Sequence, residues 1–128
     1  MNGLFVILHH TGYGPKHWDF MLEEGEALAT WQCPTNPADL PPGQTLPCQK
    51  LPDHRRAYLT YEGPISENRG KVRRVEEGRY ERLAANEQLL RVRLHGKILT
   101  GLVELRQDQS DEGWSLRRLD DAEHARDS

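Results

Sequence analysis

Short strand-like segments recur along this 128-residue chain and are separated by turn-forming residues. Residues 4–8 form an apolar run typical of a buried strand, and residues 17–23 alternate between polar and apolar side chains. A turn at Glu24 and Gly25 predicts that the second segment pairs with residues 27–31 in a hairpin. Many short strands of even spacing in a small chain predict an all-β fold, either an antiparallel barrel or a sandwich, with little helix. Further strands are predicted at 58–62, 70–75, 79–83, 89–94, 99–106 and 114–118.

The length of the chain corresponds to about one domain, which we expect over residues 1–118. Residues 119–128 are rich in charge, and we expect them to form a flexible tail. The formal net charge is −3, so no overall basic field attracts nucleic acid and phosphates must be bound by a local patch. The longest apolar run, residues 4–8, is too short for a membrane span or a signal peptide. We therefore expect a soluble, cytoplasmic protein with no membrane contact.

A stretch rich in proline lies between Cys33 and Asp53. Proline lacks the N–H group that a central strand donates to its neighbour, and a loop of this length in a small domain is usually functional. The sequence therefore predicts a long surface loop here rather than a strand. The six prolines are Pro34, Pro37, Pro41, Pro42, Pro47 and Pro52.

His17 and Asp19 are separated by one residue on a predicted strand, so their side chains lie on the same face of it. A third polar ligand could come from His9 or His10 at the end of the preceding strand, and the residues alone leave that choice open. Two imidazoles and one carboxylate leave coordination positions free for water and substrate, and they suit manganese, zinc or iron rather than calcium. The alternative is that His17 and Asp19 merely pair on a solvated strand face.

A second polar cluster occupies residues 53–58, where His54, Arg55 and Tyr58 offer an imidazole, a guanidinium and a phenol. Arginine matches phosphate oxygens bidentately, and His and Tyr donate hydrogen bonds to an anion or a leaving group. The cluster predicts a phosphate-binding site. The alternative is a solvated polar loop in which Asp53 caps a turn.

A different enzyme class can be built from some of the same residues. His17 and Asp19, with His95 as a distal histidine and Arg106 further on, imitate the metal triad and 2-oxoacid clamp of non-haem iron oxygenases. Under that hypothesis His95 is essential and His10 is dispensable.

These motifs, in this order, resemble the 3′-phosphoesterase domain of bacterial DNA ligase D, and in particular its short stand-alone relatives. That family carries a histidine after its first strand, then a His-aromatic-Asp-Phe motif, and later an Asp-His pair followed by a tyrosine. The resemblance covers most of the chain between residues 4 and 106. Its elements are FVILHH (5–10), HWDFMLE (17–23), Trp31, DHRRAY (53–58), YEG (61–63) and LHGKILTG (94–101).

The resemblance implies a compact β-barrel that trims DNA or RNA–DNA 3′ ends in DNA repair, within non-homologous end joining, by removing a terminal ribonucleoside and then a 3′-phosphate. It implies manganese as the cofactor, with zinc or another divalent cation as the alternative. The implied metal ligands are His10, His17 and Asp19, and the implied catalytic residues are His54, Tyr58 and Arg55.

The chain departs from the family pattern at positions that bear on substrate binding. Met21 and Leu46 stand where the family has arginines, and Lys50 is a candidate replacement for the second of them. These departures leave a second hypothesis open. In it, the domain binds nucleic-acid ends without hydrolysing them and serves a separately encoded ligase or polymerase.

Overall fold

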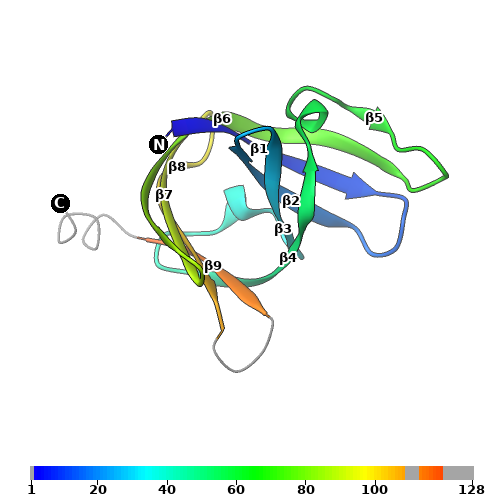
Figure 1. Ribbon diagram of the computed structural model, residues 1–128. Coiled ribbons are helices and arrows are strands. Elements are labelled where there is room, and N and C mark those ends of the chain that lie inside the picture. The colour runs from blue at the N-terminus through cyan, green and yellow to red at the C-terminus, as the bar shows by residue number, and fades with distance from the viewer. Residues whose placement is uncertain (1, 109–112, 120–128) are drawn as a thin grey trace.

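The computed structural model describes residues 2–108 and 113–119 and folds them into a closed antiparallel β-barrel (Figure 1). Within these residues, eight strands follow one another in the order β1-β2-β3-β4-β9-β8-β7-β6, and pairing of β1 with β6 closes the circle. The predicted all-β class and the barrel are therefore confirmed. The strands are β1 (Asn2–Thr11), β2 (His17–Glu24), β3 (Ala27–Cys33), β4 (Thr45–Arg55), β5 (Gly63–Pro64), β6 (Lys71–Asn86), β7 (Leu89–Gly96), β8 (Thr100–Gln107) and β9 (Trp114–Arg118), and the 3₁₀ helices are η1 (Pro37–Asp39) and η2 (Arg56–Leu59).

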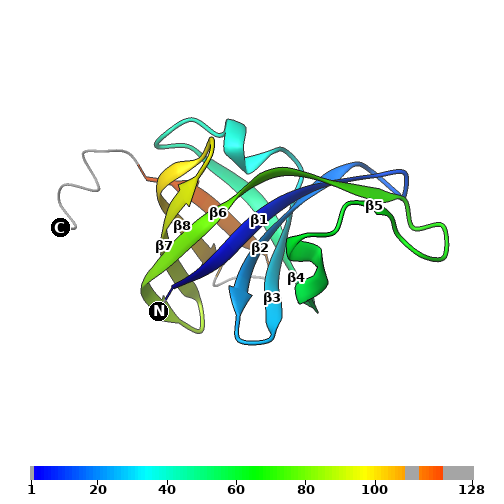
Figure 2. The ribbon, with the colours of Figure 1, turned by 90° about the horizontal axis from the view of Figure 1, so that it is seen from above.

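One continuous strand, β6, replaces the two strands predicted at 70–75 and 79–83. It pairs with β1 on one side and with β7 on the other, and in Figure 2 it runs beside β1 across the whole molecule. Gly78, which lies between the two predicted segments, is inside the strand. A Cβ atom there would lie 2.2 Å from the His95 carbonyl oxygen, so glycine permits the close approach of β7.

The proline-rich stretch is a loop only as far as position 44, and the prediction is wrong from Thr45 onward, where β4 begins. Two features let β4 hold prolines. Pro47 pairs with Ser115 of β9 just before β4 changes its partner from β9 to β3. Pro52 lies where the pairing with β3 shifts register between Leu28 and Thr30, at a bulge that needs no regular N–H donor.

The strand predicted at 58–62 is also wrong, because the chain forms η2 and a turn there. The backbone N–H groups of Thr60 and Tyr61 both donate to the Ala57 carbonyl, at 3.2 and 3.0 Å. Apolar spacing alone could not distinguish this turn from a short strand.

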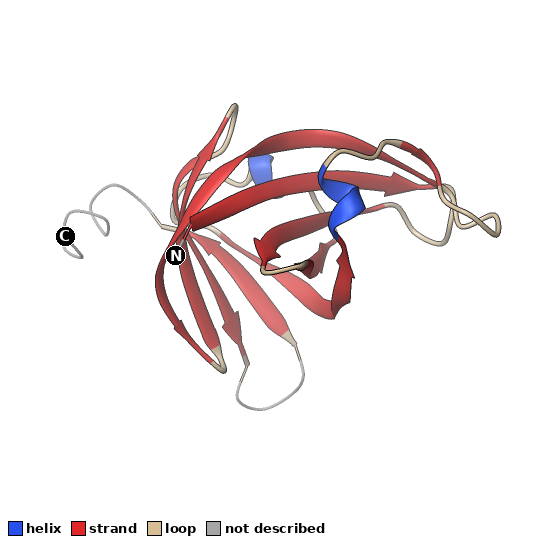
Figure 3. Cartoon of the chain, turned by 45° about the horizontal axis from the view of Figure 1, so that its top comes forward, coloured by secondary structure: helices blue, strands red, loops and turns tan. Residues whose placement is uncertain are grey.

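Two hydrophobic clusters lie on opposite faces of β1 and β2. The barrel interior holds Phe5, Ile7, Phe20 and Leu22, with the half-buried Trp18 against them, as the alternation of residues 17–23 predicts. The outer face carries the second cluster, and η2 lies beside it (Figure 3). That outer cluster consists of Val6, Leu8, Met21, Leu28 and Val72, with Tyr58, Leu59 and Ile65 packed over it.

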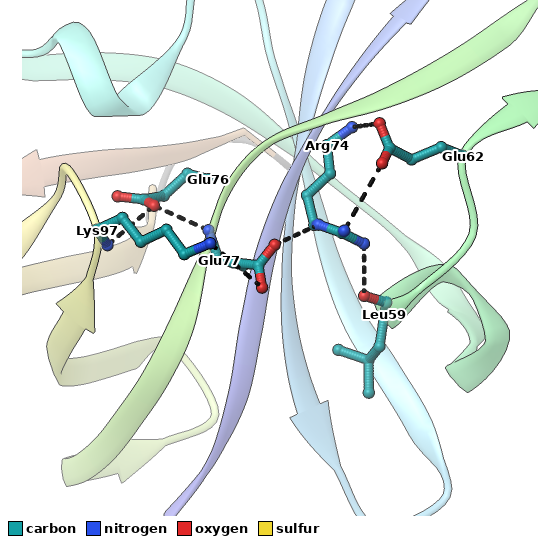
Figure 4. Close-up of polar contacts among 6 residues, drawn as sticks. All are labelled: Leu59, Glu62, Arg74, Glu76, Glu77 and Lys97. Atoms are coloured by element: carbon teal, nitrogen blue, oxygen red, sulfur yellow. Dashed lines mark hydrogen bonds and ion pairs between the residues drawn. The ribbon is translucent and has the colours of Figure 1, made fainter.

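A buried carboxylate organises the β7–β8 hairpin. Glu76 is 2% exposed and accepts backbone hydrogen bonds from Glu77 (2.8 Å) and Lys97 (3.1 Å) (Figure 4). It also accepts one from Ile98 (2.7 Å). The bonds from Lys97 and Ile98 satisfy donors of the tight turn between β7 and β8. The carboxylate therefore explains the GKIL segment of the sequence as structural.

The predicted tail lies outside the described residues except for Leu119, which is buried and donates its N–H to the Leu102 carbonyl at 3.0 Å. Among the described residues, no helix is long and apolar enough to cross a bilayer.

Candidate metal and phosphate site

Antiparallel pairing of β1 and β2 brings together the three residues that the sequence singles out as metal ligands. His10 lies directly opposite His17, and Asp19 lies opposite Leu8 on the same face. One ligand atom from each of His10, His17 and Asp19 lies within 4.8 Å of the other two. Cross-strand neighbours on one face are close by construction, so the register of a single hairpin builds the group.

His9, the alternative that the sequence left open, lies on the other face of β1. Its ring stacks on Trp18 with centroids 4.4 Å apart and planes 8° from parallel. Burial lowers the pKa of His9, and the positive charges of Arg73 and Lys16 lower it further. The structure thus places His10, and not His9, beside Asp19.

Backbone carbonyls fix the protonated nitrogen of each histidine in the group. Nε2 of His10 lies 2.7 Å from the Arg69 carbonyl oxygen, and Nδ1 of His17 lies 3.2 Å from the Pro15 carbonyl oxygen. A carbonyl only accepts, so these nitrogens carry the hydrogen in the neutral ring and the other nitrogen of each ring keeps a lone pair. Such outer contacts are the usual way in which metal-binding imidazoles are oriented.

The free lone pairs point at a carboxylate. Nδ1 of His10 is 3.9 Å from Oδ2 of Asp19, and Nε2 of His17 is 3.5 Å from Oδ1. Asp19 is 3% exposed, and its Oδ1 accepts no hydrogen bond from any residue that the structure describes. Burial raises the pKa of Asp19, and the nearby His17, His54 and His10 oppose that shift.

Three electron-pair donors facing one another in a buried position repel one another unless a positive charge lies between them. The donor set of two neutral imidazoles and one carboxylate fits a divalent transition metal, with room left for water or substrate. The residues present therefore fit a metal, while its identity does not follow from them.

A cavity of about 450 Å³ opens beside His10 and Asp19, on the outer face of the barrel. The second predicted cluster lines the same cavity, because β4 and η2 carry His54, Arg55 and Tyr58 to its wall. Nδ1 of His54 lies 2.9 Å from the Pro52 carbonyl oxygen, which leaves Nε2 for a ligand. The rings of His54 and Tyr58 are 5.9 Å apart, and the Arg55 guanidinium lies 6.0 Å from the Tyr58 ring centroid.

The residues that depart from the family pattern, Met21 and Leu46, lie in different parts of the barrel. Met21 is buried and lines the cavity, whereas Leu46 is buried in the barrel interior. Lys50, the candidate replacement, does not reach the cavity: its ammonium lies over the Trp31 ring and donates to the Leu51 carbonyl at 3.0 Å. The cavity instead contains the guanidinium-bearing residues Arg55 and Arg69.

His95 and Arg106 do not complete the arrangement required for an iron oxygenase. His95 lies on β7, where its Nε2 is 2.7 Å from Oε1 of Glu81. Arg106 forms an ion pair with Glu104 at 3.0 Å. Neither residue belongs to the group formed by His17 and Asp19.

Sequence reasoning missed Tyr13, Ile65 and Arg69, which also line the cavity. Arg69 contributes through its backbone carbonyl, and a backbone contact has no residue-type signal in a single sequence. Tyr13 and Ile65 sit in connections between strands, where hydrophobic period gives no information.

A family model of the DNA ligase D 3′-phosphoesterase domain matches residues 8–107. The chain belongs to this family. The match spans the three-residue group, the cavity and the barrel as far as the end of β8. Membership of the DNA ligase D 3′-phosphoesterase family identifies a phosphoesterase-type hydrolase of DNA repair that acts on nucleic-acid ends, in a family that is metal-dependent in general. A search of the curated proteins finds no match.

Proposed function

We propose that this protein is a divalent-cation-dependent hydrolase that removes 3′-phosphates and 3′-terminal ribonucleosides from nucleic-acid ends. One observation carries the proposal. His10, His17 and Asp19 form a group whose lone pairs face one another. Two of its members, His10 and Asp19, line the same cavity as His54 and Tyr58, the residue types that bind phosphate. Manganese is the proposed metal, with zinc as the alternative.

His10, His17 and Asp19 would hold the cation beside the cavity that His10 and Asp19 line. When bound, a divalent cation would polarise a phosphate oxygen and favour ionisation of a nearby water. Tyr58 would donate its phenolic hydrogen to a phosphate oxygen, and Arg55 would neutralise negative charge that grows in the transition state.

His54 is proposed to donate a proton to the leaving group. Its Nδ1 faces the Pro52 carbonyl, so Nε2 is the atom that gains or loses a proton. As the oxygen of water adds to phosphorus and its proton passes to solvent, the ester P–O bond would break and protonated Nε2 would donate its proton to the departing sugar oxygen. The leaving group then departs as a neutral hydroxyl.

Met21 and Leu46, which stand where the family has arginines, support a second candidate function. In it the domain is a module that binds nucleic-acid ends for a separate ligase or polymerase. The group His10, His17 and Asp19 favours hydrolysis over this alternative, because binding of a nucleic-acid end does not need three ligand atoms arranged for a cation beside the phosphate site.

The experiment compares Asp19→Ala with His54→Ala on primer–templates that end in a 3′-ribonucleotide or a 3′-phosphate, with manganese present. Asp19→Ala should lose cation binding and turnover together. His54→Ala should bind the cation as the wild type does and lose turnover. Trimming by His54→Ala at the wild-type rate contradicts its role, and DNA retention without trimming by the wild type favours the binding module.

A further inference from the structure

A second cavity of about 450 Å³ lies next to the site and is not used by the chemistry described above. The two cavities share Arg55, Tyr58 and Ile65. The Tyr58 side chain is therefore a common wall, with the His10–Asp19 group on one side and the second cavity on the other. The second cavity is completed by Ala57, Tyr61, Pro64 and Ser66.

Its walls are mainly aromatic and apolar, with polar groups at few positions. The rings of Tyr58 and Tyr61 meet edge to face, with centroids 6.0 Å apart and planes at 85°. Arg55 and Ser66 add a cation and a hydroxyl. A nucleobase is apolar on its faces and polar at its edges, so it matches this combination, and its stacking on aromatic rings needs no particular base sequence.

The wall is held in place before any ligand arrives. Arg74 of β6 donates to the Leu59 carbonyl at 3.3 Å and forms an ion pair with Glu62 at 3.6 Å, and the Arg74 backbone N–H donates to the same carboxylate at 3.1 Å (Figure 4). The Tyr61 hydroxyl donates to the Pro64 carbonyl. A rigid aromatic wall loses little conformational entropy when a planar ligand binds.

We infer that the second cavity binds the base of the 3′-terminal ribonucleoside while the adjoining phosphate lies beside the His10–Asp19 group. The inference rests on the proposed function and deepens it. It predicts that the Tyr61 ring speeds removal of a terminal ribonucleoside. The ring should not affect removal of a 3′-phosphate, because a 3′-phosphate end has no base beyond the reacting phosphorus.

The test compares three primers: one ending in a ribonucleotide, one ending in an abasic ribose, and one ending in a 3′-phosphate. The wild type should process the ribonucleotide about tenfold more efficiently, in kcat/KM, than the abasic ribose, as expected for one stacked base. Tyr61→Leu should abolish this ratio, and Tyr61→Phe, which keeps the ring, should retain it. Both variants should remove the 3′-phosphate at the wild-type rate, which also shows that they are folded.

Equal wild-type rates on the ribonucleotide and the abasic ribose would overturn the inference while leaving the proposed function intact. An equal loss by Tyr61→Leu on all three primers would also overturn it, since the ring would then serve the site as a whole. Absence of wild-type turnover on every primer would overturn the proposed function and this inference with it.

Discussion

Nε2 of His10 donates a hydrogen bond of 2.7 Å to the backbone carbonyl oxygen of Arg69. That carbonyl belongs to a loop with unusual backbone geometry, in which Glu67 and Asn68 have φ of 63° and 56° and Gly70 has φ of 81°. The Arg69 guanidinium donates to the Ser66 carbonyl and hydroxyl, at 3.0 and 3.2 Å. The loop is therefore held in a conformation that aims one carbonyl at one imidazole.

The substitution Gly70→Ala should weaken cation binding by about 10- to 100-fold, as is typical when an outer partner of a metal ligand is lost. A Cβ atom at position 70 would lie 2.1 Å from the Thr11 carbonyl oxygen, so the loop would have to move away from β1. Titration calorimetry with manganese measures the effect. The control is Gly25→Ala, at a left-handed glycine (φ 60°) with nothing within 4 Å of its added Cβ. Equal affinities for the two variants would show that the loop does not orient His10.

The substitution Asp19→Asn should leave the cation-free protein as stable as the wild type or more stable, because it removes a buried charge that lies among lone pairs. Manganese should raise the Tm of the wild type and have no effect on that of the variant. Thermal unfolding in the presence of a chelator and then of excess manganese tests both statements. A manganese-dependent rise in the Tm of Asp19→Asn equal to that of the wild type would rule out this carboxylate as a ligand.

The substitution Glu76→Ala should reduce the free energy of unfolding by about 3 kcal/mol, because it leaves the buried N–H of Leu99 and three partly buried backbone N–H groups without an acceptor. Urea unfolding measures this, with the exposed Glu87→Ala as the control. The loss should be of stability alone, so the folded variant should bind manganese normally. A change below 0.5 kcal/mol, the usual range for a surface substitution, would contradict this role.

Glu104 should make stability depend on pH. Burial acts to raise the pKa of Glu104, but Arg91 and Arg106, at 2.9 and 3.0 Å, outweigh it and hold the pKa below its ordinary value. A carboxylate whose pKa is lower in the folded state stabilises the fold above its unfolded pKa of about 4.3, and this stabilisation is lost as pH falls through the folded pKa. The difference in unfolding free energy between the wild type and Glu104→Gln should be largest at pH 7 and should shrink as the pH falls below the unfolded pKa of about 4.3. A difference that is constant over this range would exclude the ionised carboxylate as its cause.

Much of the barrel follows from residue spacing. The alternation in residues 17–23 predicts both the inward side chains, such as Phe20, and the outward position of Asp19, since a period of two leaves no other choice. Pairing of residues 17–23 with 27–31 also follows from the turn at Gly25. These features depend on neighbours in the sequence.

Features that depend on distant partners could not be predicted. In the sequence alone, Pro47 and Pro52 indicate that residues 45–55 do not form a strand. The structure allows β4 there because Pro47 lies at the change of partner from β9 to β3 and Pro52 lies at the bulge opposite Leu28. Choosing between His9 and His10 requires knowledge of the register of β1. Predicting the contact of His10 with the Arg69 carbonyl requires knowledge of the path of a loop 59 residues further along the chain. The metal ligands could therefore be predicted from the sequence, but the backbone contacts that orient their side chains could not.

We propose that His10, His17 and Asp19 together hold one divalent cation. The most direct measurement is the anomalous scattering of manganese in crystals of the wild-type protein. We expect one strong peak within bonding distance of an imidazole nitrogen of each histidine and of an oxygen of Asp19. A peak elsewhere, or none at this position in a crystal of protein that is active with manganese, would contradict it.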